Sequence, residues 1–168
     1  TTEIETVSLD HFTKEQGIDC IDFVKIDIQG AELEVFQGGT QSLKSAVGIV
    51  TEVEFVPHYH GQPLFGDVCA FLSDEGFLFH KFLGIASRSL RPFILQNNPN
   101  AGSQALWSDA VFLRNPIKLE ELSQQQLLKM AVMALTYHSI DVACTCLKVI
   151  DDRTGIDCLG QLIGTFNS

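Results

Sequence analysis

Basic residues are scarce in this chain of 168 residues. Its 11 lysines and arginines stand against 21 aspartates and glutamates, which gives a formal net charge of −10. Nucleic acids and anionic membrane surfaces are bound by clustered positive charge, so neither is expected as a partner. The sequence also has no apolar run of membrane-spanning length and no stretch with the pattern of a signal peptide.

The five cysteines are too irregularly spaced for a disulfide framework or a zinc site. Cys144 and Cys146 stand two positions apart, and no second pair completes a zinc-binding set. Most of the cysteines lie among apolar residues, which favours free, buried thiols in a reducing environment. We therefore expect a cytoplasmic protein.

The most informative stretch runs from Asp22 to Gly39 and reads DFVKIDIQGAELEVFQGG. Its apolar run, Phe23–Ile28, predicts a strand buried on both faces, as strands inside parallel sheets are. Gln29-Gly30 then breaks the run, and a helical pattern continues to about residue 46. Asp27 lies at the carboxyl end of the strand, where open α/β sheets bind ligands. It is therefore the first candidate for chemistry.

A second strand is predicted at residues 48–56, a segment rich in β-branched residues in which Glu52 and Glu54 share one face. The loop 57–63 follows this strand and contains two histidines and a tyrosine. If the two strands are parallel neighbours, this loop and Asp27 open onto the same crevice.

Helical and strand patterns continue to alternate up to residue 116, which predicts an α/β domain with a mostly parallel sheet. Asp10 is expected to cap a first helix that ends near Gly17, and residues 2–9 are compatible with an edge strand. Gly84–Ala105 is a long irregular stretch of the kind that often forms a functional loop. The other predicted elements are a helix at Leu64–Glu75 and strands at Phe77–Leu83 and Leu106–Arg114.

The last part of the chain, residues 117–168, is predicted to form a helical tail. Helical patterns cover Leu119–Tyr137 and Ile140–Ile150, and Thr154 with Asp157 resembles the capping box of a third helix. We interpret the tail as a helical hairpin joined to the sheet domain, where it serves packing or a partner surface. Three apolar residues of the third helix are expected to face inward: Ile156, Leu159 and Ile163.

The run FVKIDIQGAELEVFQGG resembles the central signature of the FkbM family of S-adenosylmethionine-dependent methyltransferases. That signature has a strand ending in Lys-hydrophobic-Asp, then Glu or Gln, Gly-Ala-Glu, and a helix that ends in glycine. Three further segments agree with it in the same order: VSLDHF, EVEFVPHYHGQPLF and LWSDAVFLR. The resemblance covers about Val7 to Arg114.

The resemblance implies a Rossmann-like class I methyltransferase fold, and specifically its C-terminal half, with strands four to seven in residues 1–116. The glycine-rich cofactor half is expected to be missing, because no Gly-x-Gly occurs anywhere in the sequence. We expect four strands in one sheet, of which the first three are parallel and the last is antiparallel. This chain alone is then expected to bind S-adenosylmethionine weakly, to be inactive, and to self-associate through the open sheet edge.

The function implied by the resemblance is methyl transfer from S-adenosylmethionine to a hydroxyl of a sugar or a secondary metabolite, a small-molecule or glycan acceptor. On this hypothesis Asp27, Glu54 and His58 are the catalytic residues. Asp27, Gln29 and Gly30 are the cofactor-binding residues, and no metal ligand is assigned. The alternative is a non-catalytic half-domain that serves assembly through its helical tail.

Several candidate residues also have simpler interpretations. Asp27 could form an ion pair with Lys25, two residues earlier on the same strand face, and Glu32 could only complement the dipole of the following helix. The loop histidines could be solvated. A set of oxygen and nitrogen ligands from Asp27, Glu54, His58 and His60 stays open as a metal-binding alternative.

Overall fold

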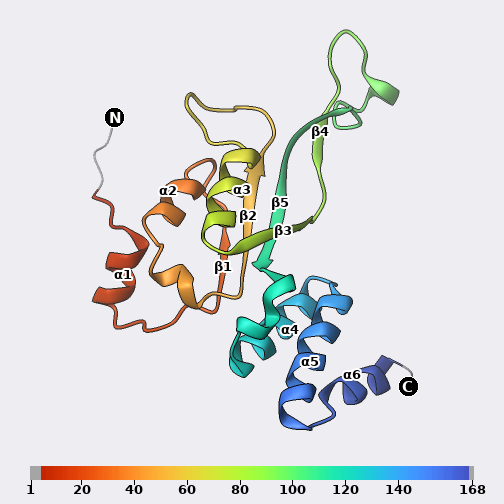
Figure 1. Ribbon diagram of the computed structural model, residues 1–168. Helices are drawn as coiled ribbons and strands as arrows, with labels where there is room; N and C mark the ends of the chain where they lie inside the picture. The colour runs from red at the N-terminus through yellow and green to blue at the C-terminus, as the bar shows by residue number, and fades with distance from the viewer. Residues whose placement is uncertain (1–4, 167–168) are drawn as a thin grey trace.

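The computed structural model, which describes residues 5–166, contains a five-stranded mixed sheet (Figure 1). The sheet order is β1-β2-β5-β3, and the short β4 pairs with β5. β1 and β2 are parallel, while β5 runs antiparallel to both β2 and β3. The predicted strand directions are thus confirmed, whereas β4 was not predicted. The strands are β1 (Phe23–Ile26), β2 (Gly48–Glu54), β3 (Phe77–Phe82), β4 (Ala86–Arg88) and β5 (Gln104–Arg114).

β1 lies at one end of the sheet order, and no described strand pairs with its outer edge. Its residues are half-buried or exposed, and Ile28, just beyond it, is 44% exposed. The prediction of a strand buried on both faces is therefore wrong. The apolar side chains of β1 do pack on both faces of the sheet. Phe23 contacts one core, and Val24 and Ile26 contact the other, but the edge position leaves these side chains partly exposed to solvent.

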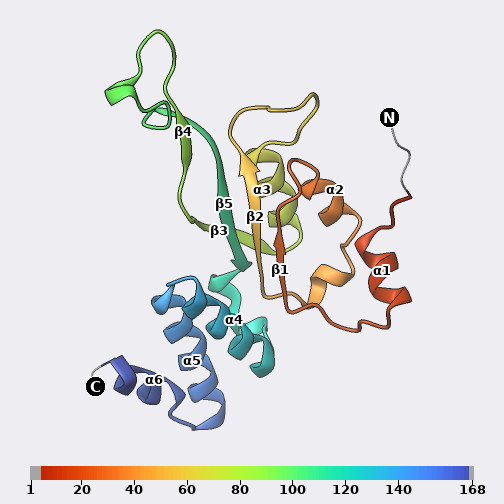
Figure 2. The ribbon, with the colours of Figure 1, turned by 180° about the vertical axis from the view of Figure 1, so that it is seen from behind.

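Helices cover the two faces of the sheet with separate cores. On one face, α2 (Glu32–Gln37) and α3 (Phe65–Asp74) pack in a cluster that includes Phe36 and Leu72. On the other face, the core holds residues of α4 (Gln124–Thr136) and α5 (Ile140–Thr154) together with Val50 of β2. Figures 1 and 2 show this second group gathered near the amino ends of β1 and β2. The carboxyl ends of these strands therefore lie away from the tail.

The predicted α1 is present at Leu9–Glu15, but its cap differs from the prediction. Ser8, not Asp10, is the N-cap residue, and its hydroxyl accepts a hydrogen bond from the backbone N–H of His11. Asp10 instead accepts from the backbone N–H groups of Gln41 (3.1 Å) and Ser42 (2.7 Å). Residues 5–8 form no strand, and residues 2–4 of the expected edge strand lie outside the described residues.

The helix after β1 is shorter than predicted. α2 ends at Gln37, and a turn containing the Gly38-Gly39 pair separates it from the 3₁₀ helix η1 (Ser42–Ser45). The apolar spacing suggested one continuous helix to residue 46. Its residues are buried in both segments, Phe36 in α2 and Leu43 in η1. The helical spacing of apolar residues therefore continues across the turn, although α2 itself ends at the glycine pair.

The described part of the tail, residues 117–166, has three α-helices, including α6 (Cys158–Phe166), but two predicted details are wrong. The predicted helix from Leu119 is divided into the 3₁₀ helix η3 (Pro116–Glu121) and α4. Thr154 does not cap α6, because it is the last residue of α5; the Asp151 carboxylate accepts from the first N–H groups of α6. Of the three residues expected inside, Ile156 is 51% exposed and Ile163 is 45% exposed, whereas Leu159 packs against the core.

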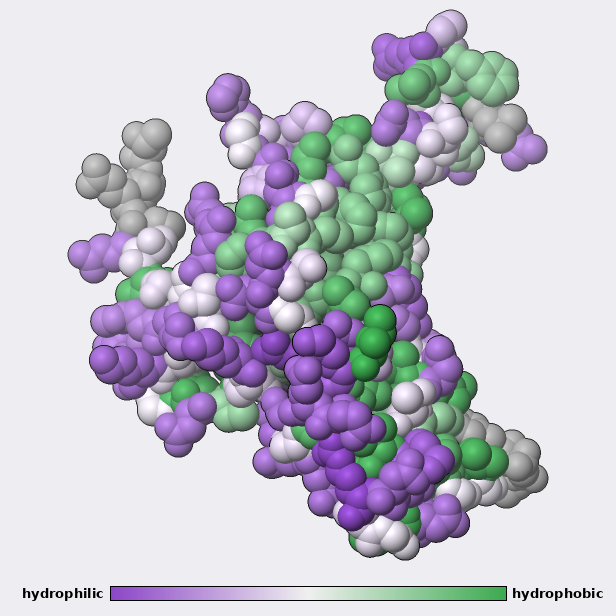
Figure 3. Space-filling view, in the orientation of Figure 1, coloured by the Kyte–Doolittle hydropathy of each residue, from purple (hydrophilic) through white to green (hydrophobic). Residues whose placement is uncertain are grey.

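The segment between β4 and β5 projects away from the sheet in both ribbon views. It contains the 3₁₀ helix η2 (Leu95–Asn97) and exposes Leu90 and Phe93 at 67% and 69%. In Figure 3, hydrophobic colour is concentrated over α3 and β3 and appears again at the end of this projecting segment. All five cysteines are free, as predicted, but only Cys146 is fully buried and Cys20 is exposed.

Candidate functional site

The turn after β1 brings polar side chains to the carboxyl end of the sheet. Gln29 and Gly30 both have positive φ angles, 61° and 107°. Glu32 fixes this turn, because its carboxylate accepts hydrogen bonds from the backbone N–H groups of Ile28 (2.7 Å) and Gly30 (2.8 Å). Glu32 is only 3% exposed. Its role is therefore larger than that of a residue that merely complements a helix dipole.

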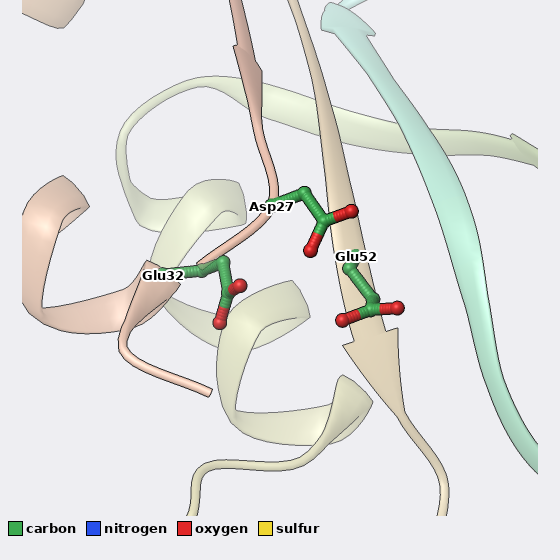
Figure 4. A group of neighbouring side chains, drawn as sticks. All are labelled: Asp27, Glu32 and Glu52. Carbon is green, nitrogen blue, oxygen red and sulfur yellow. The ribbon is translucent and has the colours of Figure 1, made fainter. Parts of the chain in front are cut away.

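Three carboxylates meet beside this turn. Asp27, Glu32 and Glu52 point toward one another (Figure 4), and ligand atoms from the three lie within 4.8 Å of one another. Gln29 links two of them, since its Nε2 donates to Asp27 Oδ1 at 3.0 Å and to Glu52 Oε2 at 2.8 Å. Burial, followed by the charges of Asp27 and Glu32, raises the pKa of Glu52.

Glu54 lies two residues further along the same face of β2 and is 5% exposed. Among the described residues, no other residue donates a hydrogen bond to its carboxylate; only its own backbone amide does. Burial, followed by the charges of Glu32 and Glu52, raises the pKa of Glu54 to about 7. A carboxyl group with this pKa can exchange a proton near neutral pH, as a general base must.

Glu54 opens onto a pocket of about 500 Å³ at the carboxyl end of β2. Trp107 of β5 enters it because this residue is the register partner of Glu54 in the antiparallel pair. The ring of His58 packs edge-on against the indole, with centroids 5.7 Å apart. A larger cavity of about 600 Å³ beside α1 contains none of the predicted site residues. The pocket is lined by Gln29, Glu52, Glu54, His58, Tyr59 and Trp107.

Gln62 holds the loop 57–63 over the turn after β1. Its Oε1 accepts from the backbone N–H groups of His58 (2.8 Å) and Tyr59 (3.1 Å). Its side chain lies so close to Gly30 that a Cβ on this glycine would stand 2.5 Å from Gln62 Nε2. The loop and the turn after β1 therefore meet at one end of the sheet, as expected for parallel neighbouring strands.

The simpler interpretation of Asp27 is wrong, because Lys25 pairs with Asp109 of β5 at 2.8 Å and not with Asp27. The four-residue metal set is not assembled either. Among the described residues, the potential metal ligands that converge as a group of three are instead Asp27, Glu32 and Glu52. His60 is exposed and outside that group. Sequence reasoning thus gave no functional role to Glu52 or Trp107, although the shared strand face of Glu52 and Glu54 was a usable signal.

Residues 1–79 match the family model described as the methyltransferase FkbM domain. This part of the chain is therefore similar to the FkbM methyltransferases. The matched residues include the acidic cluster, Glu54 and the loop 57–63, so most of the site lies within the FkbM segment. The match ends before LWSDAVFLR, residues 106–114, which contributed to the resemblance.

One curated relative supports the same family. The 2-O-methyltransferase NoeI of Sinorhizobium fredii is 39% identical over 59 residues, an alignment that covers 35% of this chain and 24% of the relative. The chain thus spans about a quarter of the length of the curated relative that it matches. No solved structure matches it significantly. Among the described residues, no helix combines the length and apolar character needed to cross a membrane.

Proposed function

We propose that this chain is the C-terminal half of a Rossmann-like class I methyltransferase domain that uses S-adenosylmethionine. The FkbM segment at residues 1–79 supports methyl transfer as the reaction. The sheet supports the fold, because three strands of one direction followed by an antiparallel strand are what the resemblance implies for strands four to seven. The unpaired outer edge of β1 lies where the other half of such a sheet would pair.

The acceptor in this proposal is a hydroxyl group on a sugar or a secondary metabolite. The name of the relative NoeI states that it transfers methyl groups to an oxygen. Trp107 and the 58% exposed Tyr59 give the pocket two flat aromatic walls against which an acceptor ring can pack. Glu52 and Gln29 supply hydrogen-bonding groups at the same place.

The observation that carries the proposal is the buried carboxylate of Glu54, which opens onto a pocket next to the family signature. When bound, S-adenosylmethionine supplies an electrophilic methyl group on a positively charged sulfonium. Carboxylates suit that positive charge, and Asp27, Gln29 and Gly30 are the residues that would hold the cofactor. Glu54 would accept the proton that the acceptor hydroxyl loses when its oxygen bonds to the methyl carbon and the methyl–sulfur bond breaks to leave a neutral thioether, and His58 would orient the acceptor.

The proposal is tested by turnover in the complete protein to which this chain belongs. Asp27→Asn and Glu54→Gln should each lower kcat by about 10²-fold, since positioning and proton transfer contribute at least that much. His58→Ala should cost less. The matched control is Glu34→Gln, an exposed acid of the same α2 helix that lies outside the cluster. Unchanged turnover of Asp27→Asn and Glu54→Gln, with circular dichroism spectra like that of the wild type, would assign both residues to structure.

A further inference from the structure

The side-chain amide of Gln62 contacts both segments that form the site. Its Oε1 accepts hydrogen bonds from the backbone N–H groups of His58 and Tyr59, which both line the pocket. The other side of the amide lies over Gly30, where an added Cβ would stand 2.5 Å from Nε2 and 3.0 Å from Cδ. One side chain therefore connects the loop 57–63 with the turn after β1.

The amide nitrogen of Gln62 is a buried donor without a partner. Less than 1 Å² of Nε2 is exposed, and no described residue accepts a hydrogen bond from it. Exchanging the oxygen and nitrogen of the amide would not correct this, because the nitrogen would then face the two backbone N–H groups that now donate to Oε1. A buried donor that stays unpaired destabilises the folded protein. Stability alone therefore does not account for a glutamine at this position.

The unpaired donor lies beside the turn that the proposed function assigns to the cofactor. Solvent does not reach Nε2 while the loop lies as described, so an acceptor comes into place only when the loop closes over a ligand. The loop has room for such a movement, because residues 57–61 are exposed and an added Cβ on Gly61 meets no atom within 4 Å. Closure of a loop over a bound ligand is a common step in enzymes.

We propose that Gln62 is a positioning residue of the methyl transfer proposed above, on which this inference rests. Its Oε1 sets the backbone of His58 and Tyr59 on the wall of the pocket. The loop closes over a ligand at the turn after β1, and an oxygen of that ligand accepts the hydrogen bond from Nε2. S-adenosylmethionine carries such oxygens in its ribose hydroxyls and its carboxylate. The same side chain thus couples occupation of the cofactor turn to the shape of the acceptor pocket.

The first test uses this chain alone, without any cofactor. Trp107 is the one tryptophan of the sequence, and the ring of His58 packs against it, so its fluorescence reports on the loop 57–63. Methionine resembles glutamine in length but has no amide, so in Gln62→Met the loop loses its anchor and acrylamide should quench Trp107 more strongly than in the wild type. The urea midpoint should not fall, because the unpaired donor is also removed. Gln37→Met, at an exposed glutamine of α2, should keep the wild-type quenching.

Wild-type quenching in Gln62→Met would overturn the proposal, because the amide would then not hold the loop. A loss of stability large enough to account for the quenching would overturn it as well, because Gln62 would then serve the fold alone.

The second test uses the complete protein and calorimetric titration with S-adenosylmethionine. Gln62→Glu keeps an oxygen for the two backbone N–H groups but has no amide donor, so it should bind the cofactor about tenfold more weakly, the effect of one lost hydrogen bond. Gln62→Met should also lower kcat by about 10²-fold, as a misplaced site does. Equal affinity of Gln62→Glu and the wild type would overturn the proposal. A wild type that binds no cofactor would instead overturn the proposed function, whereas the quenching test decides the role of Gln62 in the loop by itself.

Discussion

Gly30 occupies a position that no other residue can adopt without strain. Its φ is 107°, and a Cβ would stand 2.5 Å from Gln62 Nε2. Gly30→Ala should therefore lower the free energy of unfolding by roughly 1–3 kcal/mol, the usual cost of a side chain in such a backbone region. Urea denaturation measures this change in unfolding free energy as a shift of the transition midpoint, provided that the dependence of the free energy on urea concentration keeps the same slope.

Gly61 provides the matched control for this substitution. It also has a positive φ, 73°, but an added Cβ meets no atom within 4 Å. Gly61→Ala should cost less, and Gln62→Ala in the Gly30→Ala background should restore part of the lost stability by removing the contact. Equal midpoints for the two alanine variants would show that the contact with Gln62 is unimportant.

At the residue scale, the sequence was sufficient to place a residue at the end of a strand. It was insufficient to predict which side chains from different elements contact one another. Asp27 could be placed at the carboxyl end of a strand because the apolar run ends just after it. Its partners could not be found in this way, since Glu32 reaches back to the turn and Glu52 depends on the register of β1 with β2. Trp107 required the register of β5 against β2 as well.

At the scale of elements, a hydrogen bond between His80 and Ser139 joins the tail to the sheet. His80 of β3 contacts the hydroxyl of the buried Ser139, which precedes α5, at 2.8 Å. Burial, followed by the charge of Lys81, lowers the pKa of His80 from its ordinary 6.5, although Asp141 acts in the opposite direction. The folded protein thus favours the neutral ring more than the unfolded chain does.

This shift predicts a loss of stability in acid. As the pH falls through about 6.5, the unfolded chain takes up the proton more readily than the folded one, so the contribution of His80 is present above that pH and lost below it. In His80→Gln the fall in unfolding free energy between pH 7 and pH 5 should be smaller than in the wild type. Urea titrations at each pH measure it, and His60→Gln, in an exposed loop, is the control. Parallel pH profiles of the wild type and His80→Gln would contradict the prediction.

The boundaries of elements were predicted less well than their order. The strand positions and directions followed from apolar runs and the family resemblance. The helix after β1 was predicted too long because its apolar spacing continues through Leu43, although the Gly38-Gly39 pair ends α2 earlier. The short β4 has too few residues to produce a pattern in the sequence, and it is recognised by its antiparallel pairing with β5.

At the scale of the whole molecule, the open edge of β1 is the feature that invites association. Next to it, a groove of about 440 Å³ between β1 and α4 is lined by residues that include Phe23, Leu128 and Val132. Leu128 and Val132 are 52% and 58% exposed. A strand edge with free backbone groups beside an apolar groove can pair with another copy of the chain.

We therefore expect this chain to form dimers whose fraction rises with concentration, measured by light scattering after size exclusion. Burying two such side chains contributes roughly 1.5–3 kcal/mol each when complete. A Leu128→Glu, Val132→Glu double variant should therefore weaken the dimer by tenfold or more, at about 1.4 kcal/mol for each factor of ten. Leu90→Glu places one negative charge on an exposed leucine of the projecting β4–β5 segment and should leave the dimer unchanged. A chain that stays monomeric at high concentration, or a dimer insensitive to the double variant, would show that this edge and its groove do not mediate association.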